Sequence, residues 1–80
     1  MFCIKLNTLD VVTNLVRICD RYKEKMYIDV LCGRYTVDGA SYLGVMSLMG
    51  NVVEVKPISD DTELVNKLFE ELELIKTTLG

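Results

Sequence analysis

The sequence predicts an α+β fold with four strands and three helices in the order β-α-β-β-α-β-α. Apolar residues recur every three or four positions over residues 11–22 and 64–75, which is the spacing of an amphipathic helix. Residues 27–32 and 52–56 are instead rich in β-branched and aromatic residues, which favour strands. The chain has 80 residues, 50% of them hydrophobic, so we expect a single domain spanning residues 1–80 around one core.

The first third of the chain is expected to form a strand followed by a helix. Apolar residues alternate with others over residues 2–6, as in a strand with one buried face. After a short loop at residues 8–10, apolar residues recur at helical spacing over residues 11–22. Asp10 stands directly before this helix. We expect its carboxylate to cap free amides and to interact with the positive end of the helix dipole.

The middle of the chain is expected to form a hairpin and a short helix. Gly33-Arg34 could turn the strand at residues 27–32 into a short antiparallel partner at residues 35–37. The run from Tyr42 to Leu48 is then a short apolar helix. Ser41 is a good N-cap for it, because its hydroxyl can accept a hydrogen bond from an amide of the first turn.

The last third is expected to form the fourth strand and the third helix. Residues 52–56 are expected to form the strand and to stop near Pro57, which cannot donate a ladder hydrogen bond. Residues 59–62 then supply several candidates for the cap of a helix. The apolar stripe of that helix consists of Leu64, Val65, Leu68, Phe69, Leu72 and Ile75.

Charge and hydropathy exclude several classes of function. The net charge of −3 argues against a general nucleic-acid binder, because such proteins normally carry a basic excess. The longest apolar runs are far shorter than a membrane span, and residues 1–5 lack the regions of a signal peptide. We therefore expect a cytoplasmic protein with neither a nucleic acid nor a membrane as partner. Acidic residues gather in residues 60–73 and basic ones in 17–25, and we expect both groups on solvated helix faces.

The chain contains three cysteines, Cys3, Cys19 and Cys32, and no histidine. An odd number of cysteines without CxxC spacing does not predict a disulfide framework, and the lack of histidine weakens a zinc site further. We expect the three cysteines to be small buried hydrophobic residues. No metal site, cofactor site or catalytic dyad is recognisable, so the sequence predicts a protein that is not an enzyme.

The short apolar helix and its cap carry a family resemblance. The segment reads Ser41-Tyr42-Leu43-Gly44-Val45-Met46-Ser47-Leu48. It resembles the second helix of HPr, the small phosphocarrier of the bacterial sugar phosphotransferase system, and is most similar to the Gram-positive branch. There a serine and two apolar residues precede Gly-Val-Met-Ser-Leu. The resemblance implies an HPr-like open-faced β-sandwich, in which a four-stranded antiparallel sheet carries three helices on one face.

The resemblance fails at the family's active loop. That loop reads Gly-Leu-His-Thr-Arg-Pro-Ala in the family, and the corresponding residues here are Thr8-Leu9-Asp10-Val11-Val12-Thr13-Asn14. Asp10 stands at the position of the phosphoacceptor histidine, and Val12 at the position of the phosphate-binding arginine. Carboxylates can form acyl phosphates, but such sites normally need Mg²⁺ held by neighbouring acids. The plain interpretation of Asp10 is a helix cap.

Ser41 aligns with the regulatory serine of the family, which a dedicated kinase phosphorylates in Gram-positive bacteria. A phosphate at a helix start would meet free amides and the positive end of the dipole. The alternative is an ordinary N-cap serine that needs no kinase.

An exposed docking face is also implied by the resemblance, because HPr presents apolar residues beside its active loop. The docking residues implied here are Leu9, Tyr42, Leu43 and Met46. With Val11 and Val12 nearby, we expect this face to be unusually apolar, which often marks a partner site. The alternative is that these residues belong to the core.

The resemblance implies an HPr-like protein that does not carry phosphate and acts as a regulatory or protein-docking module. Catabolite-repression HPr-like proteins, which lost the histidine and kept the serine, are the nearest precedent. The partners so implied are HPr kinase, a transcriptional regulator or sugar-transport components. Two alternatives stay open: a divergent phosphocarrier that uses Asp10, and a structural homo-oligomerisation domain whose apolar face is buried in a homodimer.

Overall fold

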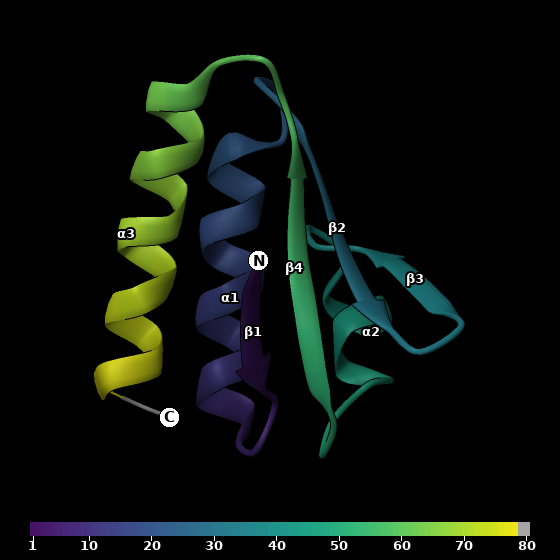
Figure 1. The fold of residues 1–80 in the computed structure, drawn as a ribbon. Helices are drawn as coiled ribbons and strands as arrows, with labels where there is room; N and C mark the ends of the chain where they lie inside the picture. Colours follow the sequence, from purple (N-terminus) through teal and green to yellow (C-terminus); the bar gives the residue numbers. More distant parts are fainter. Residues whose placement is uncertain (79–80) are drawn as a thin grey trace.

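A computed structural model describes residues 1–78 of the chain. The elements follow the predicted order (Figure 1). The strands are β1 (Phe2–Lys5), β2 (Tyr27–Cys32), β3 (Tyr35–Asp38) and β4 (Val52–Ile58). The helices are α1 (Leu9–Tyr22), α2 (Tyr42–Met46) and α3 (Thr62–Thr78).

All four strands form one antiparallel sheet in the order β1-β4-β2-β3. The register aligns one residue of each strand in a row across the sheet. This row consists of Phe2, Val55, Val30 and Val37. Because paired residues share a face, the row places apolar side chains from every strand on the same side of the sheet.

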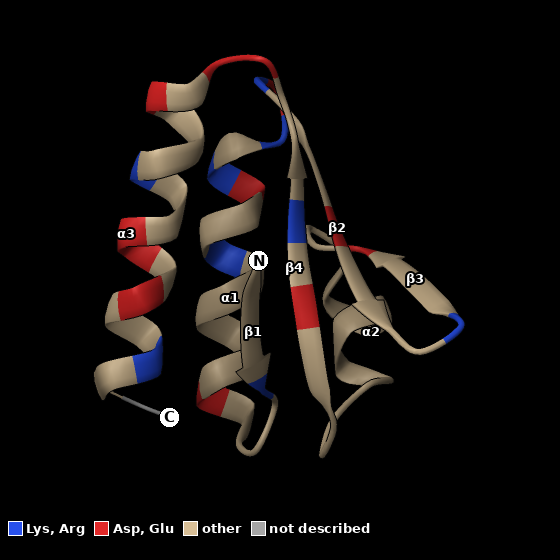
Figure 2. Ribbon diagram, in the orientation of Figure 1, with Lys and Arg blue, Asp and Glu red and all other residues tan. Residues whose placement is uncertain are grey.

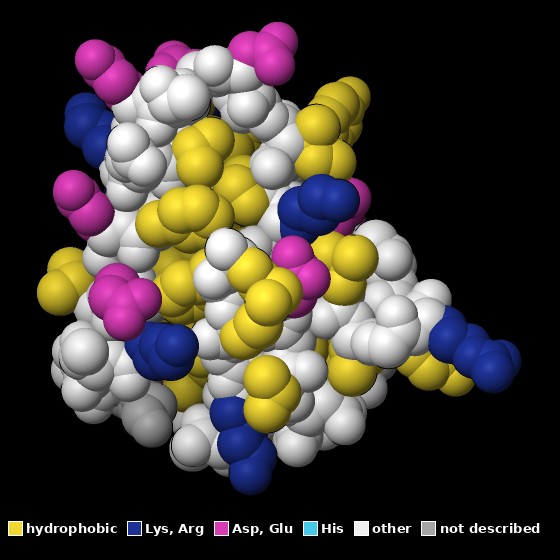
Figure 3. Space-filling view, in the orientation of Figure 1, with side chains coloured by type: hydrophobic (Ala, Val, Ile, Leu, Met, Phe, Trp, Pro, Cys, Tyr) yellow, Lys and Arg dark blue, Asp and Glu magenta, His cyan; other side chains and the backbone are white. Residues whose placement is uncertain are grey.

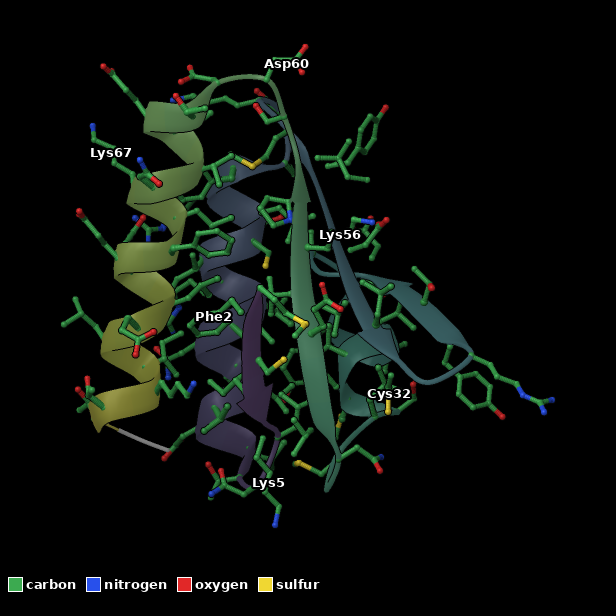
Figure 4. All side chains as sticks on the ribbon, viewed as in Figure 1. Phe2, Lys5, Cys32, Lys56, Asp60 and Lys67 are labelled. Carbon is green, nitrogen blue, oxygen red and sulfur yellow. The ribbon has the colours of Figure 1, made fainter. Side chains whose placement is uncertain are left out.

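The three helices cover one face of the sheet, as predicted. Alternate residues along the strands are buried on that face, namely Phe2, Ile4, Ile28, Val30, Val53 and Val55. They share a single core cluster with the buried side chains of α1, α2 and α3. In Figure 4, Phe2 points toward the helices, whereas Lys56 points away from them on the open side of β4.

Aromatic packing closes the edge of the sandwich between β1 and α3. The rings of Phe2 and Phe69 stack with their centroids 6.0 Å apart. The ammonium nitrogen of Lys76 lies 5.3 Å from the centroid of the Phe2 ring, which is cation–π geometry. Figure 3 shows the hydrophobic side chains that fill the space between α3 and the strands on this side.

The fourth strand ends near Pro57, as predicted, but it includes the proline and runs two residues beyond the expected 52–56. β4 continues through Pro57 to Ile58 and stays paired with β2 up to Tyr27. β1 ends its pairing at Phe2 opposite Val55, so β4 has a neighbour on one side only beyond that point. A proline is tolerated there, because its nitrogen can face the edge that has no strand.

The prediction that Asp10 caps α1 is also wrong. Thr8 is the N-cap, and its hydroxyl oxygen accepts a hydrogen bond from the amide of Val11 at 3.3 Å. The helix therefore begins at Leu9, and Asp10 lies exposed in the first turn. An acid in this turn still interacts favourably with the positive end of the helix dipole.

The two other helix starts agree with the sequence-based expectations. Ser41 caps α2, and its hydroxyl oxygen accepts a hydrogen bond from the amide of Gly44 at 3.2 Å. A carboxylate oxygen of Asp61 accepts one from the amide of Leu64 at 3.1 Å and so caps α3. The second helix is shorter than expected, because it ends at Met46 and the chain continues in turns.

The cysteines differ in their surroundings. All three are free, but only Cys19 is fully buried, whereas Cys3 and Cys32 are half-buried. The expectation of three buried residues therefore holds for Cys19 alone. Burial, with the negative charge of Asp38, raises the pKa of the Cys19 thiol to about 12, so it stays protonated at neutral pH.

The charged residues of α1 and α3 are exposed, as expected of solvated helix faces, except Glu71, which is half-buried where the two faces meet. Arg21 forms an ion pair with Glu71, and the hydroxyl of Tyr22 donates a hydrogen bond to the same carboxylate. Glu71 therefore links α3 to α1 through two side chains of α1. Figure 2 shows that α1 and α3, which both carry charged residues, lie side by side.

The contacts of Glu71 with Arg21 and Tyr22 predict that the stability of the protein depends on pH. Burial opposes the charged form of Glu71, but the hydrogen bonds from Tyr22 and Arg21 outweigh it and hold the pKa of Glu71 below its usual 4.5. A lowered folded-state pKa stabilises the protein above the unfolded pKa, and this stability is lost as the pH falls through the folded pKa. Glu71→Gln should cost about 1 kcal/mol at neutral pH.

Urea unfolding at pH values from about 7 to about 3 tests this expectation. The wild type should lose more stability than Glu71→Gln below pH 4.5. If the free energy of unfolding falls equally in the two proteins as the pH is lowered, Glu71 does not couple folding to pH. The matched control is Glu73→Gln, because Glu73 is exposed on the same helix.

Candidate functional site

The candidate site lies at the end of the sandwich where the loop after β1 meets the loop after α2. The amide of Gly50 donates to the carbonyl of Leu6 at 2.7 Å, and the amide of Leu6 donates to the carbonyl of Asn51 at 2.9 Å. These two hydrogen bonds hold the loops together, and α1 also contacts α2. The start of α1 at Leu9, three residues after Leu6, therefore lies at the same end of the sandwich as the loop after α2.

Close packing of α2 on β3 fixes which side of the helix faces outward. A Cβ atom at Gly44 would lie 3.2 Å from Cβ of Val37, so the lack of a side chain lets the helix approach the strand. Val45 and Leu48 are buried in the core below. The remaining large apolar side chains of the segment are consequently left on the surface.

We call this exposed region the α2 surface. It consists of Leu43 (79% exposed), Leu9 (49%), Tyr42 (39%), Met46 (37%) and Met49 (36%). The first four are the docking residues implied by the sequence, and the alternative that they belong to the core is wrong. Met49 was missed, since it lies beyond the matched segment and its exposure depends on the turn after α2. Docking itself stays a prediction.

All residues of the α2 surface except Leu9 lie in an uncharged part of the chain. From Gly39 to Val53 there is no Asp, Glu, Lys or Arg. Figure 2 accordingly shows α2 and the chain that follows it without a charged residue before β4. Burying charged groups costs free energy, because they lose their hydration. A partner that covers an apolar surface without charges avoids most of this cost.

Val11 and Val12 do not belong to this surface, contrary to expectation. Both side chains are fully buried in the core. The helix begins one residue before Asp10, and its phase turns residues 11 and 12 inward. The residue at the former phosphate-binding position, Val12, thus lies below the surface on which Asp10 is exposed.

Asp10 stands apart from other groups that could assist phosphoryl transfer. Within residues 1–78 it has no ion-pair partner. That part of the chain also holds no cluster of three or more His, Cys, Asp or Glu side chains that could bind a metal ion. The backbone carbonyl of Asp10 accepts a hydrogen bond from the side-chain amide of Asn14 at 2.7 Å.

Ser41 lies at the border of the α2 surface and is half-buried. Besides its capping bond to Gly44, its amide donates to the carbonyl of Asp38 at 3.0 Å. The carboxylate of Asp38 accepts a hydrogen bond from the amide of Ala40 at 2.9 Å, so an acid lies close to the start of α2. A phosphate on Ser41 would meet amides of the first turn and this negative charge.

Comparison with known proteins identifies the fold. No protein-family model matches the sequence, and no curated protein matches it. The crystal structure of HPr-C-His from Thermoanaerobacter tengcongensis is similar to this chain, with a TM-score of 0.71 and 21% sequence identity. The match covers 96% of this chain and 90% of that one. The chain therefore has an HPr-like fold. No helix within residues 1–78 is long and apolar enough to span a membrane.

Proposed function

We propose that this HPr-like domain is a regulatory module that docks protein partners on the α2 surface and does not carry phosphate. The observation that supports docking is the exposure of five large apolar side chains, four of which lie in a segment without charge. Isolated apolar residues are common on protein surfaces, whereas a contiguous apolar area often marks an interaction site.

The composition of the α2 surface suits a protein partner. Leu43 is the most exposed residue of the α2 surface and would be the main anchor, because burying a leucine side chain contributes about 1.5–3 kcal/mol. Tyr42 adds an aromatic ring of the kind that is enriched in interface hot spots. Met46 and Met49 supply flexible thioethers, which adapt to partners of different shape.

Three features argue against a phosphocarrier. Exchange of a phosphohistidine depends on an imidazole, and the chain has no histidine. Val12 is buried and offers no guanidinium to hold a phosphate. Asp10 belongs to no group of three or more His, Cys, Asp or Glu side chains that could hold a metal ion within the described residues. Incubation with labelled phosphoenolpyruvate and enzyme I should leave the domain unlabelled. A label that disappears in Asp10→Ala would instead establish the divergent phosphocarrier.

Docking is tested by titrating the ¹⁵N-labelled domain with purified HPr kinase, a transcriptional regulator that binds HPr-like proteins, and sugar-transport components. Binding should shift the amide signals of residues 41–49. Leu43→Glu should weaken that binding about tenfold or more, because it places a charge in the centre of the interface. Leu74→Glu is the matched control, since Leu74 is an exposed leucine of α3 outside the α2 surface.

Unchanged binding by Leu43→Glu, or shifts confined to another face, would exclude the α2 surface as the docking site. The same conclusion follows if none of the three classes of partner binds. Circular dichroism of each variant verifies that the fold is intact.

Ser41 is the modification site proposed for this module. A phosphate there would add about −1.5 to −2 charges to the border of an uncharged surface and so change its affinity for a partner. HPr kinase should label the wild type and Ser47→Ala but not Ser41→Ala. Ser47 is a suitable control because it is an exposed serine of the same segment, with its hydroxyl donating to the carbonyl of Gly44 at 2.6 Å.

Loss of the cap should also lower the stability of Ser41→Ala by about 1 kcal/mol. Ser41→Asp should retain the cap, because aspartate is an equally good N-cap residue. Labelling of Ser41→Ala, or no labelling of the wild type, would contradict the assignment of Ser41.

A further inference from the structure

A hollow with a buried apolar floor lies where the end of α1, the start of β2 and the turn after β3 meet. Its volume is about 350 Å³, which lies within the range of about 300–1,000 Å³ that is typical of small-molecule sites. The floor is formed by the buried side chains of Cys19, Met26 and Ile28. The floor therefore favours a ligand with an apolar body.

The rim of this hollow carries more acidic than basic groups. Lys23, Glu24 and Asp38 line the hollow and are exposed. The ammonium nitrogen of Lys23 is already paired with a carboxylate oxygen of Asp20 at 3.0 Å. Glu24 and Asp38 form no ion pair within residues 1–78. The rim thus has two carboxylates left without a counter-ion, and a further cation would be attracted to it.

Two titratable groups of the hollow sense this negative charge. The hydrogen bond and the charge of Asp20 raise the pKa of the Lys23 ammonium, and the charges of Glu24 and Asp38 raise it further. Burial raises the pKa of the Cys19 thiol at the floor, and the charge of Asp38 adds to this effect. The negative charge of the rim therefore reaches both the edge and the floor of the hollow.

We propose that the hollow binds a small organic cation, with its ammonium group at the acidic rim and its apolar body on the buried floor. Tyr27 also lines the hollow and is 77% exposed, so its ring is available to an ammonium or to an aryl group. An anion would be repelled by Glu24 and Asp38. A metal ion is disfavoured, because residues 1–78 hold no cluster of three or more His, Cys, Asp or Glu side chains that could bind one.

The size of the hollow favours a free molecule over the lysine side chain of a partner protein. A lysine stem is thin and unbranched, so it would leave much of the volume of about 350 Å³ unfilled. A ring on a short chain that ends in an ammonium group would cover the floor and still reach the rim. The proposal does not rest on the docking function, since the hollow shares no residue with the α2 surface.

The turn after β3 connects the hollow to the start of α2. The carboxylate of Asp38 accepts a hydrogen bond from the amide of Ala40 at 2.9 Å. The carbonyl of Asp38 accepts another from the amide of Ser41 at 3.0 Å. A cation bound at Asp38 should therefore perturb the amides of residues 38–41 together with those around the floor.

Titration of the ¹⁵N-labelled chain with phenethylammonium tests the proposal. The amide signals of residues 19–28 and 38–41 should shift to saturation, and salt should weaken the binding. Phenylethanol has a similar shape without the charge and should bind about fivefold more weakly or worse, whereas phenylacetate should not bind. Nα-acetyllysine amide should bind more weakly than phenethylammonium, because its stem fills less of the hollow.

Substitutions at the rim should change the affinity for phenethylammonium in opposite directions. Glu24→Gln and Asp38→Asn should each weaken the binding about threefold. Asparagine can still accept the hydrogen bond of the Ala40 amide, so the turn should persist. Lys23→Gln should strengthen the binding, because it removes the ammonium that competes for the carboxylates. Glu73→Gln is the matched control, because Glu73 is an exposed acid of α3 outside the hollow.

A substitution within the hollow completes the test. Ala40 lines the hollow, so Ala40→Leu should fill part of it and abolish the binding of phenethylammonium. If this variant does not fold, the exposed positions decide, because a loss of affinity in Lys23→Gln like that in Glu24→Gln excludes selection by the acidic rim.

Three results of the titrations would overturn the proposal. The first is the lack of saturable shifts with phenethylammonium. The second is equal binding of phenethylammonium, phenylethanol and phenylacetate, because the hollow would then select apolar bodies alone. The third is tighter binding of Nα-acetyllysine amide, which would assign the hollow to a lysine side chain of a partner protein.

Discussion

Leu68→Ala is expected to lower the free energy of unfolding by about 2–5 kcal/mol. Leu68 is fully buried in the middle of α3, and it belongs to the core cluster that joins the helices to the sheet. Truncation to alanine removes apolar contacts and leaves a cavity that the neighbouring side chains can fill only in part. A domain of this size has about 4–12 kcal/mol of stability in total, so the variant should be close to unfolding.

Urea denaturation followed by circular dichroism measures this loss, at a protein concentration where the chain is monomeric. Leu74→Ala is the control, because it makes the same chemical change at an exposed position of the same helix. It should change the stability by less than about 0.5 kcal/mol. Equal effects of the two substitutions would show that α3 is not held through the face that carries Leu68.

Gly39→Val is expected to destabilise the domain by about 3 kcal/mol. Gly39 is buried, and a Cβ atom there would lie 2.9 Å from Sγ of Cys19 and 3.0 Å from the carbonyl oxygen of Ile28. That carbonyl accepts the amide of Gly39 at 2.8 Å, so the backbone cannot move away without losing the hydrogen bond. The close approach of the loop to α1 and β2 requires a residue without a side chain.

The thiol of Cys19 should account for part of this cost. Cys19→Ala removes the nearer of the two obstructing atoms, so a double variant with Gly39→Ala should lose less stability than the sum of the two single variants, by about 1 kcal/mol. Thermal unfolding of the four proteins of this cycle measures the difference. Strict additivity would mean that the carbonyl of Ile28, and not the thiol, excludes a side chain at residue 39.

Local patterns were sufficient to predict much of the fold. The bounds of β2 and the apolar stripe of α3 follow from the spacing of side chains along one segment, because burial of one face imposes a period of two or of 3.6 residues. The capping of α2 by Ser41 is equally local, since donor and acceptor lie three residues apart. The docking residues were instead implied by the resemblance to HPr, because side-chain spacing alone did not separate an exposed face from the core.

Other features were decided only when distant parts of the chain came together. Pro57 stays in β4 because β1 is too short to pair beside it. The length of β1 cannot be predicted from the residues that surround Pro57 in the sequence. Thr8 and Asp10 are both good caps, and the phase of α1 against the core selects Thr8 and turns Val12 inward. Arg21 and Glu71 are 50 residues apart, so their pairing depends on how α3 packs against α1.

The sequence by itself therefore determined the order of the elements, the caps of α2 and α3, and the segment that carries the candidate site. The tertiary structure decided which apolar side chains of that segment stay exposed, where α1 begins and β4 ends, and which charged residues of α1 and α3 pair. The physical reason is that periodicity and capping are satisfied within a few residues. Exposure, strand edges and ion pairs between elements depend instead on contacts across the whole chain.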